Sequence, residues 1–297
     1  MFAQQLLNGV VVGSVYALFA LGFTLVFGIN HVLNLAHGAV FTLGAFAALY
    51  GITLLDLPLP AAALLAVLAG GLASVLLDLV CFRPLRARQA PEFAAIVSSI
   101  GAGLILTSLA QQVSATQVMR FPFGTFPVVV WRVLGLRVQL LQLVIIGSVA
   151  VMVVALLLYL YRTELGRQVR AVAISGRTAQ LLGINPAAVF AQVFFIAGAL
   201  AGAAGVLIGL AFNSVHYVMG EPLLLRAFVV VVLGGMGSIV GAVVAGLLLG
   251  VVQSLSVAYA SSGVADAVIF GLLFLVLLLR PAGLFGGHSV AARVVRA

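Results

Sequence analysis

Residues 140–160 read LLQLVIIGSVAVMVVALLLYL, an apolar run without a charged side chain. At about 1.5 Å per residue, a helix of this length spans roughly the 30 Å hydrocarbon core of a bilayer. The run lacks the polar and apolar alternation that a strand of a transmembrane barrel needs. Since backbone groups in lipid must be hydrogen-bonded within the protein, only a helix remains. The stretch therefore predicts a membrane-spanning helix and an all-α fold class.

The rest of the chain has the same character. Of its 297 residues, 64% are hydrophobic and only 7% are charged. A water-soluble domain carries about 25% charged residues, so most of this surface must face lipid. We expect a polytopic integral membrane protein that forms one transmembrane domain over residues 1–297, with about eight transmembrane helices and additional broken or re-entrant segments. The apolar segments run over 6–28, 38–55, 61–82, 93–112, 138–161, 187–212, 227–259 and 264–279.

The charged residues exclude several classes of function. All 14 basic residues are arginines, and they lie between the apolar segments rather than on one basic face, which argues against a nucleic-acid partner. Without lysine the chain has neither a Walker A loop nor a Schiff-base lysine, and neither HExxH nor GxSxG occurs. We expect a protein that is not an enzyme and that has no cofactor and no metal site.

The arginines also predict how the chain is oriented, because basic loops stay on the cytoplasmic side. Counting spans from the first cluster places the N-terminus outside. The loop 113–137 then also lies outside, where its aromatic residues and prolines suit either the headgroup level or an external partner. The clusters assigned to the cytoplasm are Arg83, Arg86 and Arg88; Arg162, Arg167, Arg170 and Arg177; and Arg280, Arg293 and Arg296.

One apolar segment must be interrupted. Three segments separate the second arginine cluster from the third, although both clusters are expected on the same side. The run 227–259 is too long for one crossing and contains Gly234, Gly235 and Gly237. Discontinuous helices at membrane depth line cavities, so we expect these glycines in a substrate path. No alignment of the two halves reveals an inverted repeat.

Glycines concentrate in the second half of the chain. Small residues four positions apart let two helices approach closely. The clustering predicts tight packing, within this chain rather than against a partner. The pairs are Gly198 and Gly202, Gly205 and Gly209, Gly237 and Gly241, and Gly246 and Gly250.

Residues 163–186, TELGRQVRAVAISGRTAQLLGINP, form the longest polar interval on the predicted cytoplasmic side. At 100° per residue, Leu165, Val169 and Val172 share one helix face, and Arg167 and Arg170 share another. Two interpretations remain open at this point. The helix docks into a groove of a partner, or it rests on lipid headgroups as an ordinary interfacial helix.

This interval resembles the cytoplasmic coupling loop in permease subunits of bacterial ATP-binding cassette (ABC) importers. Three further stretches resemble the LivH-type permeases of branched-chain amino acid uptake. They are GSVYALFALGFTLVFGINHVLNLAHG near the start of the chain, AFVVVVLGGMGSIVGAVVAG at 227–246 and RPAGLFG at 280–286. The resemblance implies an inner-membrane permease that works by alternating access. It also implies a second homologous permease subunit, two cytoplasmic ATP-binding subunits and a periplasmic solute-binding protein.

The resemblance also implies which residues couple the permease to ATP hydrolysis. The coupling segment covers about 162–186, and the coupling glutamate corresponds to Glu164. Leu165 and Gly166 stand where the family usually has two alanines. The predicted coupling residues are Glu164, Gly166, Arg167, Arg170, Ala171, Arg177 and Gly183.

A polar patch lies between the first two apolar segments. On a helix, Asn30, Asn34 and His37 would share one face, and His31 lies beside them. These side chains either line a hydrophilic path or form structural hydrogen bonds at a helix break before Gly38. The residues predicted to line the substrate path are Asn30, Asn34, His37, Gly38, Glu221, Gly234, Gly235 and Gly237.

Few other polar groups fall inside the apolar segments. Asp78 is expected to reach the membrane interface. Glu221 and Arg226 are five residues apart and could pair with each other or cap the broken helix.

Three functions stay open beside a branched-chain amino acid permease: an ABC permease for urea, amides or another small polar solute, an ion-coupled secondary transporter, and a structural membrane scaffold.

Overall fold

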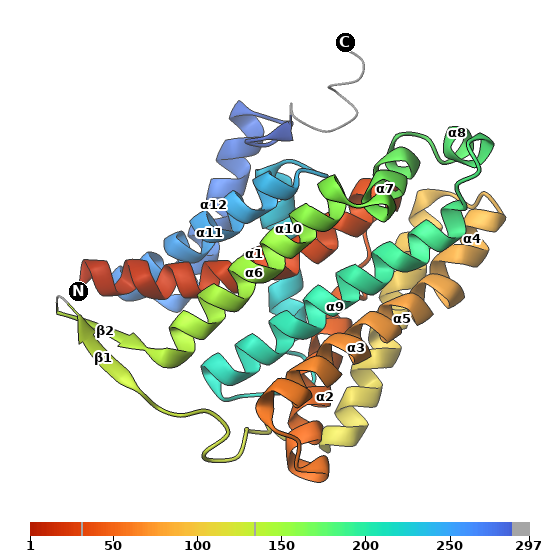
Figure 1. The fold of residues 1–297 in the computed structure, drawn as a ribbon. Helices are drawn as coiled ribbons and strands as arrows, with labels where there is room; N and C mark the ends of the chain where they lie inside the picture. Colours follow the sequence, from red (N-terminus) through yellow and green to blue (C-terminus); the bar gives the residue numbers. More distant parts are fainter. Residues whose placement is uncertain (31, 134, 287–297) are drawn as a thin grey trace.

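The computed structural model in Figure 1 describes residues 1–30, 32–133 and 135–286. Helices form nearly all of it, and a π-helical segment, η1 (Asp78–Phe82), joins α3 to α4. The α-helices are α1 (Phe2–Asn30), α2 (His37–Leu55), α3 (Leu59–Leu77), α4 (Arg83–Ala87), α5 (Glu92–Ser114), α6 (Leu140–Arg162), α7 (Glu164–Ile174), α8 (Gly176–Leu181), α9 (Pro186–Phe212), α10 (Gly220–Gly234), α11 (Ile239–Tyr259) and α12 (Ser262–Leu279).

Among the described residues, seven helical stretches are long and apolar enough to cross a membrane. They are α1, α2, the continuous stretch Leu59–Ala87, α5, α6, α9 and α11, while α10 and the apolar part of α12 are shorter. The prediction of an all-α polytopic membrane protein is confirmed.

The predicted interruption of the run 227–259 is confirmed. Helix α10 ends at Gly234, and α11 begins at Ile239 after a turn in which Gly235 and Gly237 have positive φ angles of 99° and 83°. The hydroxyl of Ser238 accepts a hydrogen bond from the amide of Gly241 and caps α11. Four helices, α9 to α12, therefore lie between the second and third arginine clusters. This even number satisfies the parity that the sequence required.

Helix α1 lies at the centre of the molecule (Figure 1) and is buried over most of its length. It packs antiparallel to α11, with Gly13 on the backbone of Leu247. Helices α3 and α9 form a second antiparallel pair, in which Gly70 and Gly198 lie backbone to backbone. Gly198, Gly202, Gly246 and Gly250 all contact other helices of this chain, as the glycine pattern predicted.

The two halves of the fold form an inverted repeat. Helices α1, α2, α3 and α5 correspond to α9, α10, α11 and α12: α1 packs on α11 as α9 packs on α3, and α5 contacts α2 as α12 contacts α10. The side-chain amide of Gln4 in α1 donates a hydrogen bond to the carbonyl of Arg137. The Oδ1 of Asn213, after α9, accepts a hydrogen bond from the backbone amide of Phe121. Helix α1 therefore begins, and α9 ends, at the end that carries the loop 113–137. The repeat lies in helix packing, which explains why no sequence alignment revealed it.

The loop 113–137 and the arginine clusters lie at opposite ends of the bundle. The loop includes an antiparallel hairpin of β1 (Val130–Val133) and β2 (Leu136–Gln139), in which Val130 pairs with Gln139. Phe121 is buried under α9, whereas Trp131 is half-exposed. At the other end, Arg86 reaches Asn30 at the end of α1. Arg293 and Arg296 lie outside the described residues.

Candidate functional site

Helices α2 and α10 both begin inside the bundle, and their first turns meet. A methyl group added at Gly38 would lie 2.7 Å from the carbonyl oxygen of Gly220. The hydroxyl of Thr42 donates a 3.1 Å hydrogen bond to the carbonyl of Gly38. Two helix starts that face each other at membrane depth are typical of transporters built from inverted repeats. Glycine is required at this crossing because no side chain fits between the two backbones.

The predicted common face of Asn30, Asn34 and His37 is wrong, because α1 ends at Asn30 and α2 begins at His37. Asn34 is 2% exposed, and its Oδ1 accepts a 3.2 Å hydrogen bond from the amide of Ala36. The fully buried His37 places Nε2 3.3 Å from the carbonyl oxygen of Phe19. These contacts favour the structural interpretation for Asn34 and His37. His31 lies outside the described residues.

Four rings pack together beside this crossing. The ring centroid of Phe19 lies 4.7 Å from that of His37 and 5.3 Å from that of Phe41. Phe23 stands edge-on to His37 at 6.0 Å. All four residues are buried. We call Phe19, Phe23, His37 and Phe41 the aromatic barrier.

Cavities lie on both sides of the aromatic barrier along α1. The outer cavity, of about 350 Å³, extends from Gln5 and Asn8 down to Phe41. The inner cavity, of about 270 Å³, lies between Thr24 in α1 and Arg170 in α7. A smaller cavity of about 210 Å³ between α2, α5 and α10 is lined by Gly38 and Glu221.

The segment 280–286, which we call the clasp, packs over the glycine turn between α10 and α11. The amides of Leu284 and Phe285 donate hydrogen bonds of 2.8 and 3.1 Å to the carbonyls of Leu233 and Gly234. Gly235 packs on the backbone of Gly286. Of the three glycines predicted in the substrate path, Gly237 lines the inner cavity, whereas Gly234 and Gly235 are buried under the clasp.

Helix α7 turns back sharply against the end of α6. The hydroxyl of Thr163 accepts a 3.0 Å hydrogen bond from the amide of Gly166, which caps the helix. A side chain at Gly166 would overlap the carbonyl oxygens of Tyr159 and Leu160. Val169 and Val172, on the predicted apolar face, are buried against the rest of this chain.

The structure separates the residues within each predicted face of α7. Leu165, placed on the apolar face, is 46% exposed. Arg170 does not share the solvent face with Arg167: its guanidinium is half-buried, lies 5.4 Å from the ring centroid of Tyr161 and lines the inner cavity. Arg167 remains exposed and pairs with Glu164.

The remaining predicted coupling residues lie beyond or behind this face. Ala171 is half-buried and packs against the core. Arg177 is exposed on α8, a separate helix that begins after Ser175. Gly183 has a φ angle of 79° in the turn before α9, where Asn185 caps the amide of Ala187.

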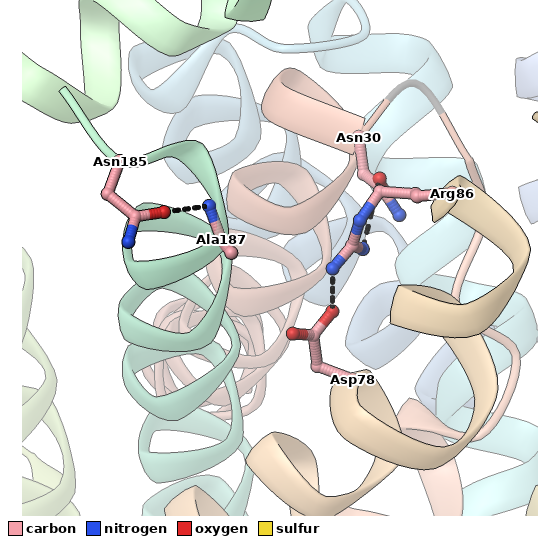
Figure 2. A network of polar contacts seen from close by, with 5 residues as sticks. All are labelled: Asn30, Asp78, Arg86, Asn185 and Ala187. Atoms are coloured by element: carbon pink, nitrogen blue, oxygen red, sulfur yellow. Dashed lines mark hydrogen bonds and ion pairs between the residues drawn. The ribbon is translucent and has the colours of Figure 1, made fainter. Parts of the chain in front are cut away.

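Arg86 in α4 links η1 to the end of α1 (Figure 2). Arg86 donates to Asp78 at 2.5 Å and to the Oδ1 of Asn30 at 3.4 Å. The guanidinium also lies 4.1 Å from the ring centroid of Phe190. The side chain of Asp78 is only 1% exposed, so the prediction that it reaches the interface is wrong. Its burial is tolerated because Arg86 satisfies its charge.

Arg226 belongs to a second polar cluster, which the sequence did not reveal. It donates a 2.7 Å hydrogen bond to the hydroxyl of Tyr16 and pairs with Asp266 at 3.2 Å. Tyr16 in turn donates to the Oε1 of Gln253 at 2.6 Å. Of the two alternatives for Glu221 and Arg226, pairing with each other is wrong, since Arg226 pairs with Asp266, whereas Glu221 lies in the first turn of α10. Among the described residues, no group of three potential metal ligands occurs.

The comparisons with known proteins agree with this architecture. A family profile described as branched-chain amino acid transport system, permease component, matches residues 5–278. The permease protein BraD of a high-affinity branched-chain amino acid transport system in Pseudomonas aeruginosa is 36% identical, with 97% of each chain covered. LivH of Escherichia coli strain K12, a permease protein of the same kind of system, is 34% identical with the same coverage.

A solved structure, PsaBC from Streptococcus pneumoniae in complex with Fab, aligns over 99% of this chain and 94% of its own, with 14% identity and a TM-score of 0.48. The profile match and the two relatives establish the family of this chain. This multi-pass membrane protein belongs to the family of permease components of branched-chain amino acid transport systems.

Proposed function

We propose that this chain is a membrane-spanning permease subunit of an ABC importer and translocates branched-chain amino acids across the bacterial inner membrane by alternating access. The observation that carries the proposal is the family match over residues 5–278, joined by relatives that are 34–36% identical over 97% of the chain. Those relatives are permease proteins of high-affinity branched-chain amino acid transport systems.

The partners follow from the same proposal. The energy comes from two cytoplasmic ATP-binding subunits, because a chain without lysine lacks a Walker A loop of its own. A second homologous permease completes the membrane part, and a periplasmic solute-binding protein delivers the amino acid at the end that carries the loop 113–137. The arginine clusters then face the cytoplasm, as the distribution of basic residues predicts.

The coupling surface in this proposal is the exposed side of α7 and α8. Glu164, Arg167 and Arg177 are the exposed charged residues there, and they would contact the ATP-binding subunits. Gly166 holds α7 directly on the end of α6, so a displacement of α7 also moves α6. Val169 and Arg170 line the inner cavity, so the same displacement changes its opening.

The aromatic barrier serves as the closed gate between the two cavities. The four buried rings lie between the two cavities, which have no lining residue in common. Helix α1 packs with α10 and α11, and α9 packs with α2 and α3, so rigid-body rocking of these two bundles would separate α1 from α2 and part Phe19 from His37 and Phe41. His37 then acts as a packing element of the gate, and Gly38 with Gly220 forms the pivot.

Reconstitution tests the function directly. The complete transporter, made of this chain with its partner permease, ATP-binding subunits and binding protein, is placed in liposomes with ATP inside and labelled leucine outside. We expect accumulation of leucine that requires both ATP and the binding protein. Accumulation by this chain alone, driven by an ion gradient, would instead identify a secondary transporter, and accumulation of urea but not leucine would correct the substrate.

A further inference from the structure

The outer cavity combines one charged group with polar and apolar walls. Its polar side consists of Tyr16, Arg226 and Gln253, and its apolar side includes Phe41, Ile208 and Leu223. Its volume of about 350 Å³ falls within the range of small-molecule sites, about 300–1,000 Å³. Such a cavity suits a ligand with a charged head and a short aliphatic chain.

Arg226 lies near the middle of the membrane-spanning region, where a charged side chain is unfavourable. Its partner Tyr16 is near the middle of the 29-residue α1, and the Arg226 side chain is only 26% exposed. Charged side chains within membrane spans are costly and mark substrate or ion pathways. Arg226 lines the outer cavity, so its charge faces the cavity and not the lipid.

The guanidinium is held in place but retains hydrogen-bonding capacity. One terminal nitrogen donates to Tyr16 and the other to Asp266, which fixes the plane of the group. Arginine carries five N–H donors, so two hydrogen bonds leave three available. Asp266 is 57% exposed and contacts only one terminal nitrogen of Arg226, so it does not enclose the guanidinium. The planar donor fork matches a carboxylate in a bidentate geometry.

We propose that the outer cavity is an amino-acid-binding site of the permease, in which Arg226 binds the α-carboxylate of the transported solute. The aliphatic side chain lies against Phe41, Ile208 and Leu223. The ammonium group faces the amide oxygen of Gln253, which Tyr16 orients. This inference rests on the proposed function and adds the ligand contacts, at a site separate from the delivering protein.

The site also gives the aromatic barrier a second task. Phe41 belongs to both the barrier and the floor of the outer cavity. An aliphatic side chain bound beside Arg226 therefore touches the gate itself. A bound solute would bias the packing of Phe41 against Phe19, so occupancy and gate opening are linked.

Equilibrium binding of labelled L-leucine to the purified complete permease and ATPase complex, without the binding protein, tests the site. R226Q should weaken binding about tenfold or more, as expected when a charged hydrogen bond is lost. R226K keeps the charge without the planar fork and should give an intermediate affinity. R132Q, at an exposed arginine of the hairpin, is the matched control and should bind like the wild type.

The partner of Arg226 separates a ligand site from a purely structural ion pair. Removing the competing carboxylate in D266N should keep the leucine affinity or strengthen it by up to about fivefold, opposite in sign to R226Q. The inference is wrong if D266N weakens binding as much as R226Q. It is also wrong if R226Q, with normal elution in gel filtration, binds leucine like the wild type.

Ligand analogues test the same contact without any mutation. 4-Methylpentanoate, which has the carboxylate but no ammonium group, should compete with leucine, and leucinol, which lacks the carboxylate, should not. Equal competition by both would show a merely apolar cavity and overturn the inference. Absence of leucine binding to the wild-type complex would overturn it too. The proposed function fails separately, if the wild-type transporter with its binding protein accumulates no leucine.

Discussion

Helices α2 and α10 occupy equivalent places in the inverted repeat but are built for different tasks. Six residues after Gly38, α2 carries Gly44, and a methyl group there would lie 2.9 Å from the carbonyl oxygen of Gly202. Six residues after Gly220, α10 carries Arg226, which lines the outer cavity. One copy closes the space between helices, and the other leaves a polar cavity. Repeated architecture thus supplies the frame, and single positions within it decide where a solute can bind.

The crossing of Gly38 and Gly220 is the feature on which both copies depend, and breaking it should have the largest effect. In G220A the added methyl group overlaps the carbonyl of Gly38, so the two half-helices have to move apart. Such overpacking costs about 1–3 kcal/mol or more. We expect little folded protein in the membrane, measured by gel filtration of a fluorescent fusion, and therefore no transport. In the matched control G147A, the methyl group meets nothing within 4 Å, and G147A should accumulate normally.

The two ion pairs offer the next contrast between the halves. Asp78 is buried with Arg86, whereas Asp266 is largely exposed beside Arg226. Removing one partner of a buried pair costs about 3–5 kcal/mol, and an exposed pair contributes about 0–1 kcal/mol. D78A should therefore lower the melting temperature of the purified complex clearly, and D266N hardly at all. Equal shifts would show that the two pairs carry similar structural weight.

The segment α6 to α8 has no counterpart in the repeat, so substitutions there can change coupling without changing the packing of the two halves. R167E reverses an exposed charge and should separate ATP hydrolysis from leucine uptake, at unchanged protein abundance. R170E places a carboxylate beside Tyr161 in the inner cavity, so we expect slower uptake through a changed cavity. Uptake per ATP hydrolysed in liposomes distinguishes the two. Normal coupling in R167E would remove α7 from the proposed docking surface.

The smallest effect is expected at the turn between α8 and α9, where the second half of the repeat begins. Gly183 has a φ angle of 79°, which favours glycine, so G183A should cost about 1 kcal/mol. Gly176 at the start of α8 has open space around it and no positive φ, so G176A should be neutral or slightly stabilising. Thermal melting of the two variants measures the difference. A larger loss in G176A would mean that the geometry of α8 matters more than that of the turn.

The fold was predictable wherever one local signal decided it. Long apolar runs marked α1, α3, α6 and α9, and parity with three glycines located the break between α10 and α11. The polar residues were harder, because their partners are distant in sequence. His37 meets the carbonyl of Phe19, and Arg226 meets Tyr16 across 210 positions. Periodicity suggested a helix through Asn34, because the spacing of residues along the chain carries no information about a reversal of the chain. That reversal separates α1 from α2 and places the start of α2 inside the bundle.

The coupling segment shows the same limit on a smaller scale. The apolar spacing identified Val169 and Val172 correctly, because burial of one helix face is a local property. Arg170 was misplaced because Tyr161, on the preceding helix, draws its guanidinium toward the inner cavity. The roles of Glu164, Arg167 and Arg177 in docking stay predictions.

The clasp of residues 280–286 over the glycine turn has a consequence for synthesis. The ribosome makes these residues after α1 to α12, yet two of their amides complete the end of α10. A nonsense codon at position 282 would release a chain whose helices can all insert but whose α10 terminus stays open. Completion of α10 therefore depends on residues that are made only after α12, so the second half of the fold cannot reach its final packing before they emerge.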